Sequence, residues 1–162
     1  MIEPLAREIT GLLGLDVVRR PPSFDPEEAY DPARGQYDTR ALLSRLISQQ
    51  LEGGKILGVT DVDLFVPVLT FVFGEAQLGG RAAVVSSHRL APERYGLPAD
   101  RNVLEQRLFK EAIHELGHTY ELVHCSDSRC VMASSPAVEE IDLKTPRFCS
   151  DCRNILGPAL SE

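Results

Sequence analysis

The stretch HELGHTYELVHC, residues 114–125, constrains this chain most, because it holds three of the four histidines in the sequence. His114 and His118 are four residues apart in a segment of helical spacing, which places both imidazoles on one helix face. Two imidazoles at this spacing can bind one metal ion, and Glu115 can reach a water molecule on that ion. The pattern predicts a zinc site in which Glu115 is the general base for attack of a metal-bound water on a carbonyl carbon.

His124 is the natural third ligand, because catalytic zinc of this kind needs three protein ligands and an open fourth position. In a straight helix His124 would lie about 9 Å beyond His118 along the axis, so the helix has to end between them. Position 121 holds a glutamate, for which a left-handed backbone costs roughly 1 kcal/mol or more. That cost is small beside the ~10 kcal/mol scale of zinc binding, so we expect a turn at or next to Glu121. The alternative is a helix with two surface histidines.

The four cysteines of the chain all lie in its last quarter. Cys125, Cys130, Cys149 and Cys152 follow the pattern C-x4-C-x18-C-x2-C. Two close pairs separated by a loop favour a closed tetrahedral zinc site with a structural role. The alternative is four buried or partly oxidised thiols. Together the two constellations predict two zinc ions per chain, one catalytic and one structural.

Length and charge restrict the class of protein. The 162 residues are 43% hydrophobic and 25% charged, which is typical of one globular domain spanning residues 1–162. The net charge of −7 argues against binding to nucleic acid or an anionic membrane. The longest apolar stretch, residues 64–73, is shorter than the ~20 residues of a membrane helix, and residues 1–15 do not resemble a targeting segment. We expect a cytoplasmic protein.

Hydrophobic spacing predicts an α+β fold with a mixed sheet. One helix is expected from about Thr39 to Leu51, with Asp38 or Thr39 as its N-cap and Gly53-Gly54 at its end, and another from about 100–102 through His118. Strands are expected over residues 14–20, 55–60, 65–73 and 81–87. Pro67 makes the third of these an edge strand, along which an extended substrate could bind by strand addition.

Four further side chains invite a functional reading but are better explained as structural. Asp61 and Asp63 stand two apart at the end of a strand, where capping or hydrogen bonding of a turn is expected rather than cation binding. His88 is interpreted as a surface histidine. Glu75 is expected in a turn, with a solvated carboxylate.

The motif HExxHxxxxxHC, followed by Cys130-Val131-Met132 and by Cys149-Ser150-Asp151-Cys152, resembles the archaemetzincins, a branch of the metzincin zinc peptidases. The upstream stretch KILGVTDVDLFVPVLTFVFGEAQLGGRAAVVSS resembles the same family, so the similarity spans most of residues 55–152. The family pattern has a glycine where this chain has Glu121.

The resemblance implies a twisted mixed sheet with one antiparallel edge strand, an active-site helix, a Met-turn and a C-terminal helix. It also implies a catalytic zinc on His114, His118 and His124 with Glu115 as base, a Met-turn methionine at Met132, and a second zinc on the four cysteines. The predicted function is a zinc metallopeptidase acting on a peptide or protein substrate. The alternatives are a zinc-containing module that binds peptides or proteins with little or no turnover, and a zinc-ribbon interaction module.

Overall fold

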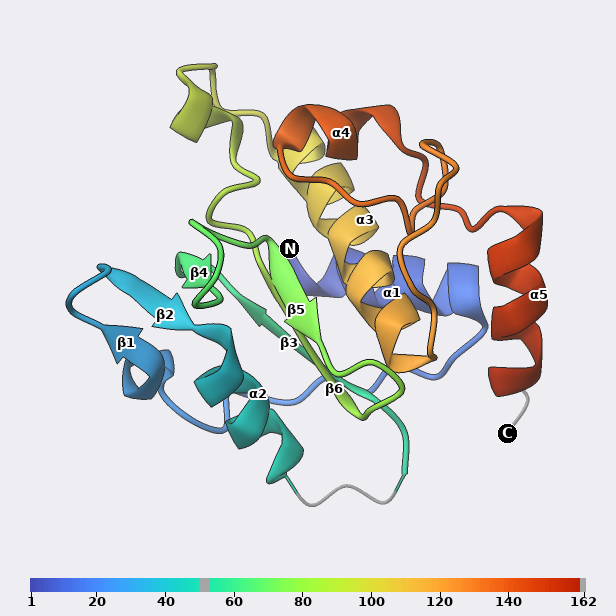
Figure 1. The fold of residues 1–162 in the computed structure, drawn as a ribbon, viewed down its shortest axis with the longest axis horizontal. Coiled ribbons are helices and arrows are strands. Elements are labelled where there is room, and N and C mark those ends of the chain that lie inside the picture. The colour runs from blue at the N-terminus through green and yellow to red at the C-terminus, as the bar shows by residue number, and fades with distance from the viewer. Residues whose placement is uncertain (50–52, 161–162) are drawn as a thin grey trace.

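A computed structural model describes residues 1–49 and 53–160, and shows helices on both faces of a small central sheet (Figure 1). The helices are α1 (Ile2–Leu13), α2 (Thr39–Ile47), α3 (Arg101–Thr119), α4 (Val138–Leu143) and α5 (Ser150–Ala159), with short 3-10 turns at Pro26–Ala29 (η1) and Pro92–Tyr95 (η2). The strands are β1 (Tyr30–Asp31), β2 (Gln36–Asp38), β3 (Ile56–Thr60), β4 (Leu64–Phe65), β5 (Gly74–Ala76) and β6 (Ala82–Ser86). The presence of helices together with a mixed sheet confirms the predicted α+β class.

The central sheet has the strand order β3-β6-β5 and is mixed. Strand β3 runs parallel to β6 with Val59 opposite Val85, and β5 runs antiparallel to β6 with Glu75 opposite Val84. A second small sheet has the order β1-β2-β4. The antiparallel strand β5 is therefore an edge strand of the central sheet within the described residues.

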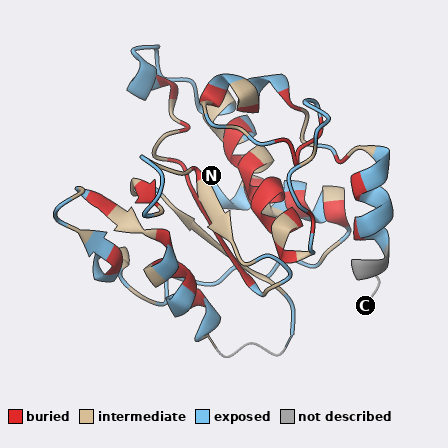
Figure 2. Cartoon of the chain, viewed as in Figure 1, coloured by how far each residue is buried: buried red, intermediate tan, exposed pale blue. Residues whose placement is uncertain are grey.

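Two hydrophobic clusters lie on opposite faces of the central sheet, because successive side chains of a strand alternate between faces. Val84 packs with α2 in one cluster, and Val85 packs with α1 and α3 in the other. Figure 2 shows buried residues along β6 and along the C-terminal half of α3. Helix α3 is thus held between the sheet on one side and the C-terminal segments on the other.

The predicted starts of both long helices are confirmed by their capping bonds. The Asp38 carboxylate accepts a hydrogen bond from the Arg40 amide at 2.9 Å, and Asp100 accepts from the amides of Asn102 at 2.9 Å and Val103 at 3.1 Å. Strands β3 and β6 occupy the stretches predicted for them, residues 55–60 and 81–87. The first helix ends earlier than predicted: α2 stops at Ile47 with Ser48 as its C-cap, before Leu51, which lies outside the described residues.

The strand predicted over residues 14–20 is wrong. Those residues form no regular element, and the preceding residues form α1 instead. Leu5, Ile9 and Leu13 recur every four residues and are all buried, whereas Val18 is 78% exposed. Helical periodicity of the N-terminal segment therefore outweighs the short β-branched run that follows it.

The single edge strand predicted over residues 65–73 is also wrong. Strand β4 stops at Phe65, and a turn closed by the Leu69 amide on the Val66 carbonyl at 3.0 Å follows. The edge strand is β5, so Glu75 lies in a strand and accepts a hydrogen bond from the Thr39 hydroxyl rather than occupying a turn. Pro67 fits the turn better than a strand, because its ring fixes φ and removes a donor.

A buried ion pair connects α3 to the C-terminal part of the chain. The Lys144 side chain is fully buried, and its Nζ lies 2.8 Å from Glu111 Oε1 and donates to the Ala133 carbonyl at 3.2 Å. Glu111 is itself only 4% exposed. Both charged groups are removed from water, so each needs the opposite charge of the other to offset the free-energy cost of its burial.

Replacing Lys144 with methionine should destabilise the protein by about 3–5 kcal/mol, because Glu111 is left buried without its partner. Urea denaturation at saturating zinc measures the loss. The control is Lys110→Met, which removes a half-buried lysine that donates to the Ile141 carbonyl at 2.9 Å. A loss for Lys144→Met no larger than that of the control would contradict the dependence on the pair.

Candidate metal centres

Helix α3 presents His114 and His118 on one face, and backbone carbonyls orient both rings. The Nδ1 of His114 lies 2.9 Å from the Val131 carbonyl oxygen, and the Nδ1 of His118 lies 2.7 Å from that of Leu122. A carbonyl can only accept, so each Nδ1 carries the proton and each Nε2 presents a lone pair. The two Nε2 atoms face each other at 3.1 Å.

The third predicted histidine lies beside the other two. The His124 ring centroid is 5.2 Å from that of His114 and 5.1 Å from that of His118, and one ring nitrogen of each residue lies within 4.8 Å of the others. Four ligands at a Zn–N distance of about 2.05 Å in a tetrahedron would stand about 3.3 Å apart. The two Nε2 lone pairs at 3.1 Å would repel without a cation between them, so this donor set fits a zinc ion.

Burial keeps the two helical imidazoles in the form that binds metal. Removal from water lowers the pKa of His114 to about 3, and the positive charge of Lys144 acts in the same direction. Burial also lowers the pKa of His118. Both rings are therefore neutral at physiological pH, as a metal ligand has to be.

The turn expected at Glu121 is present. Glu121 has φ of 68° and is the one non-glycine residue with positive φ in the described part of the chain. The Glu121 amide donates to the His118 carbonyl at 3.1 Å, and the Leu122 amide donates to the Gly117 carbonyl at 3.1 Å. This pair of bonds is the Schellman motif, which ends a helix through one left-handed residue.

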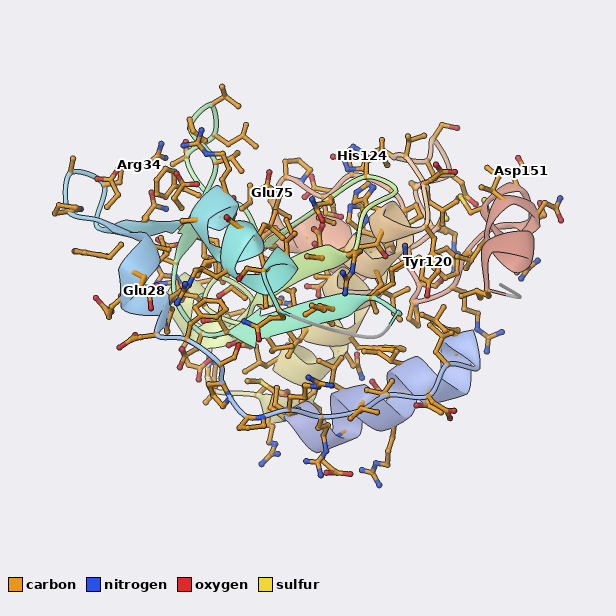
Figure 3. The ribbon with its side chains drawn as sticks, turned by 90° about the horizontal axis from the view of Figure 1, so that it is seen from below. Glu28, Arg34, Glu75, Tyr120, His124 and Asp151 are labelled. Atoms are coloured by element: carbon orange, nitrogen blue, oxygen red, sulfur yellow. The ribbon has the colours of Figure 1, made fainter. Side chains whose placement is uncertain are left out.

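This turn also sets the histidine geometry. Leu122 is 1% exposed and is therefore fixed in the core, and its carbonyl is the one that orients His118. The next residues leave α3 in the reverse direction and bring His124 beside the helix. His124 itself is exposed and lies near the upper surface of the molecule in Figure 3.

Glu115 lies on α3 directly beneath the edge strand. It is 5% exposed, and a Cβ added at Gly74 of β5 would stand 2.7 Å from its Cγ and 2.6 Å from the Val84 carbonyl oxygen. Only a glycine allows β5 to pass this close to the carboxylate. Burial raises the pKa of Glu115 well above its usual range, and the nearby charge of Glu111 raises it further. A cation bound by the histidines would act in the opposite direction.

Met132 fills the space behind the histidines. It is fully buried, and a Cβ added at Gly117 would lie 2.5 Å from its sulfur. Gly117, between His114 and His118 on α3, therefore allows Met132 to pack against the helix backbone. The Met132 carbonyl in turn accepts a hydrogen bond from the Cys125 amide at 2.9 Å, next to His124.

The four cysteines also converge, and all are free thiols. The Sγ atoms of Cys125 and Cys149 are 3.7 Å apart, those of Cys130 and Cys152 are 3.8 Å apart, and all four lie within 4.8 Å of one another. A disulfide would need about 2.05 Å, whereas thiolates at about 2.3 Å from a tetrahedral zinc stand about 3.8 Å apart. The donor set and its spacing fit a closed zinc site.

Backbone amides donate hydrogen bonds to sulfur atoms of this cluster. The Asp127 amide donates to Cys125 Sγ at 3.4 Å, and the Cys149 amide donates to Cys130 Sγ at 3.3 Å. The Cys152 amide, as the largest influence, lowers the pKa of Cys149. Burial raises the pKa of Cys152, and hydrogen bonds with Cys149 and Cys130 raise it further.

The other residues considered have structural contacts. Asp63 forms a paired ion contact with Arg89 at 2.5 and 2.7 Å, which is stronger than the turn bond expected of it. His88 is half-buried rather than on the surface, with Nδ1 3.0 Å from the Asp61 carbonyl oxygen and Nε2 2.8 Å from Arg94.

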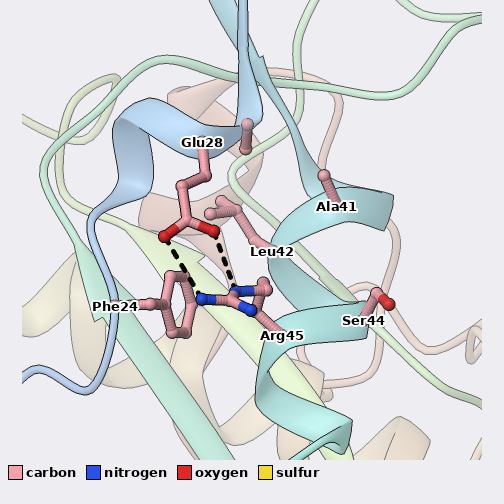
Figure 4. A pocket seen from close by; sticks show the side chains of 7 residues that line it. Phe24, Glu28, Ala41, Leu42, Ser44 and Arg45 are labelled. Carbon is pink, nitrogen blue, oxygen red and sulfur yellow. Dashed lines mark hydrogen bonds and ion pairs between the residues drawn. The ribbon is translucent and has the colours of Figure 1, made fainter.

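A separate pocket lies between η1 and α2, lined by Phe24, Leu42 and neighbouring residues and crossed by an ion pair between Arg45 and Glu28 at 3.0 Å (Figure 4). None of the lining residues is one of the three histidines or four cysteines, and Figure 3 shows Glu28 well to the left of His124. The pocket is therefore separate from both metal-site candidates.

The sequence profile of the family described as Peptidase family M54 matches residues 21–157, which include both constellations. This chain belongs to peptidase family M54. Membership makes it a zinc metallopeptidase, and thus a hydrolase, as its resemblance to the archaemetzincins implies.

Two archaemetzincins are similar to this chain over most of their length. An archaemetzincin of Methanocaldococcus jannaschii is 46% identical over 132 residues, which are 81% of this chain and 72% of the relative. An archaemetzincin of Methanopyrus kandleri is 41% identical over 156 residues, 96% of this chain and 86% of the relative.

Solved structures of similar proteins share the fold. The crystal structure of archaemetzincin from Methanopyrus kandleri superimposes with a TM-score of 0.88 at 40% identity, over 99% of this chain and 86% of the other. A zinc-dependent peptidase from Methanocorpusculum labreanum gives a TM-score of 0.86 at 36% identity, over 94% of this chain and 91% of the other. Within the described residues, no helix combines the length and apolar character needed to cross a bilayer.

Some contacts of the site were not recognised in the sequence. Gly74 and Lys144 belong to this group, because their partners are distant in the chain. Gly74 stands in a stretch that was expected to be a turn, where a glycine needs no further explanation. A glycine at the start of a strand next to another element is, however, a known indication of close backbone approach.

Replacing Glu121 with glycine should stabilise this M54 protein by up to about 1 kcal/mol, because glycine adopts positive φ without steric cost. Thermal and urea unfolding of the zinc-loaded protein measure the change. The matched control is Glu105→Gly, in the interior of α3, where glycine should destabilise by about 1 kcal/mol. A loss of stability for Glu121→Gly similar to that of the control would contradict strain at this turn.

Proposed function

We propose that this M54 protein hydrolyses peptide bonds at a catalytic zinc ion held by His114, His118 and His124, with Glu115 as the general base. The observation that carries the proposal is that the imidazoles of His114, His118 and His124 converge beside the buried carboxylate of Glu115. Glu115 lies on α3, the helix that also carries His114 and His118. The two helical rings are oriented through Nδ1 by backbone carbonyls, so their Nε2 atoms point at one common position.

When bound, zinc supplies a Lewis acid that polarises the peptide carbonyl and lowers the pKa of a nearby water molecule. Glu115 takes the proton from the attacking water and passes it to the leaving amine. Its burial favours this role, because a carboxylate removed from water holds a proton more strongly than an exposed one. Strand β5 shields the carboxylate from bulk water at Gly74.

The four cysteines would hold a second zinc ion that has a structural role. Four thiolates leave no open coordination position, so no reaction is assigned to this site. It would join the segment after His124 to α5, since Cys125 follows His124 directly and Cys152 lies on α5. Met132 would be the Met-turn residue, packed against α3 behind the histidines.

The substrate would be a peptide or protein in extended form, bound along β5. This strand is the edge of the central sheet in the described part of the chain, and it passes over Glu115. An extended peptide that pairs with such an edge places its backbone, and hence a scissile bond, along the strand. The sequence prediction of substrate binding at an edge strand thus moves from residues 65–73 to Gly74–Ala76.

Metal analysis of the purified protein should give close to two zinc ions per chain. Cys152→Ser should lower the content to close to one and destabilise the protein, because zinc on four cysteines contributes folding free energy of the order of 10 kcal/mol. The control Ser150→Ala, on the same helix, should retain both ions. About one zinc ion in the parent with all thiols reduced would refute the two-site proposal.

Glu115→Gln should lower peptide hydrolysis by at least about 10²–10⁴-fold, the usual contribution of a general base, while both zinc ions remain bound. Peptide cleavage assays together with metal analysis check both statements. Glu105→Gln is the matched control on the same helix, since Glu105 forms an exposed pair with Arg101 at 2.9 Å. Hydrolysis by Glu115→Gln at the rate of the parent would rule out the assignment of the base.

A further inference from the structure

The C-terminal end of α3 receives hydrogen bonds from outside the helix as well as from its own turn. The Lys55 Nζ donates to the Thr119 carbonyl at 2.8 Å and to the Gly80 carbonyl at 2.8 Å. The Gly79 amide donates to the His118 carbonyl at 2.9 Å. The β5–β6 loop and the residue before β3 therefore bond to the last carbonyls of the helix, which the helix itself cannot satisfy.

Three consecutive carbonyls of α3 are satisfied in this way. The Gly117 carbonyl accepts from Leu122, that of His118 accepts from Glu121 and from Gly79, and that of Thr119 accepts from Lys55. The positive charge of Lys55 also stands at the negative end of the helix dipole, where a cation is favoured. Lys55 is thus part of the arrangement that ends the helix at Thr119.

The Glu121 side chain lies between this loop and the turn. A Cβ added at Gly79 would be 3.0 Å from Glu121 Cγ and 3.3 Å from Oε1, so Glu121 passes directly over Gly79. Gly79 has φ of 64°, which also favours glycine there. Two left-handed residues, one on each segment, are therefore in contact where the loop meets the end of α3.

The negative charge of Glu121 favours the charged form of Lys55. Burial lowers the pKa of Lys55, and the negative charge of Glu121 acts against that shift. The Lys55 ammonium also stands 4.7 Å from the centre of the Tyr120 ring, within the range of a cation–π contact. Lys55 therefore contacts or attracts three consecutive residues of the turn, Thr119, Tyr120 and Glu121.

We propose that Lys55 is a positioning residue for the three-histidine site, which it supports by holding the left-handed turn at Glu121 together with the β5–β6 loop. The turn fixes the Leu122 carbonyl that orients His118, and it returns the chain to His124. A residue other than glycine at position 121 strains this turn. Hydrogen bonds from outside the turn therefore contribute more to its stability than they would if position 121 were glycine. This inference rests on the proposed metal site.

The test is the Zn²⁺ affinity of the three-histidine site, measured by chelator competition on protein whose four-cysteine site is already loaded. Lys55→Met should weaken this affinity by about tenfold, the equivalent of one hydrogen bond from a charged group. Lys55→Arg, which keeps the charge and the donors, should restore most of it. In the Glu121→Gly background, Lys55→Met should have a clearly smaller effect, because the turn is no longer strained and has no carboxylate.

Lys110→Met is the matched control, since Lys110 also donates to a backbone carbonyl but at α4, and it should leave Zn²⁺ affinity unchanged. If Lys55→Met does not fold, Lys55→Gln takes its place with the same expectation. Unchanged Zn²⁺ affinity of Lys55→Met, or an equal loss of affinity in the parent and Glu121→Gly backgrounds, would overturn the proposed role of Lys55. Either result would leave the proposed function standing. If the three histidines of the parent bind no Zn²⁺, both the role of Lys55 and the proposed function are overturned. If the Zn²⁺ affinities are as expected but the parent does not hydrolyse peptides, only the proposed function is overturned.

Discussion

Three imidazoles can share one ion only if the helix that carries two of them stops directly after the second. The chain meets this requirement one residue beyond His118, at Thr119, and a left-handed residue at Glu121 turns it back. The bond from the Leu122 amide to the Gly117 carbonyl fixes the turn, and the Leu122 carbonyl in turn receives His118 Nδ1. The end of the helix and the orientation of a proposed ligand are thus parts of one hydrogen-bonded unit.

A second set of backbone contacts joins the two proposed zinc sites. His124 and Cys125 are adjacent, and the Cys125 amide is bonded to the Met132 carbonyl, while the Val131 carbonyl receives His114 Nδ1. A metal bound by the cysteines would hold the segment that carries His124, and it would also fix the segment that orients His114. The proposed structural site would therefore act on the proposed catalytic site through these backbone contacts.

The parts of the site that were predictable from sequence are those whose geometry is local. His114 and His118 are one helical turn apart, Asp38 and Asp100 cap helices within three residues, and the cost of a left-handed glutamate is known. The short apolar runs at residues 55–60 and 81–87 likewise predicted β3 and β6. The strand predicted over residues 65–73 failed because a β-prone composition cannot show that Pro67 and Val68 are used in an exposed turn.

The contacts that could not be predicted join residues far apart in the chain. Lys55 is 64 positions from Thr119, and no local pattern links a lysine before a strand to the end of a later helix. The same is true of Lys144 and Glu111, and of Gly74 and Glu115. Each pair serves a different part of α3. Lys55 caps its C-terminal end, Lys144 compensates the buried charge of Glu111, and Gly74 leaves room for the Glu115 side chain. A metal-binding motif therefore specifies the donor atoms, whereas long-range contacts of this kind specify how precisely those atoms are held.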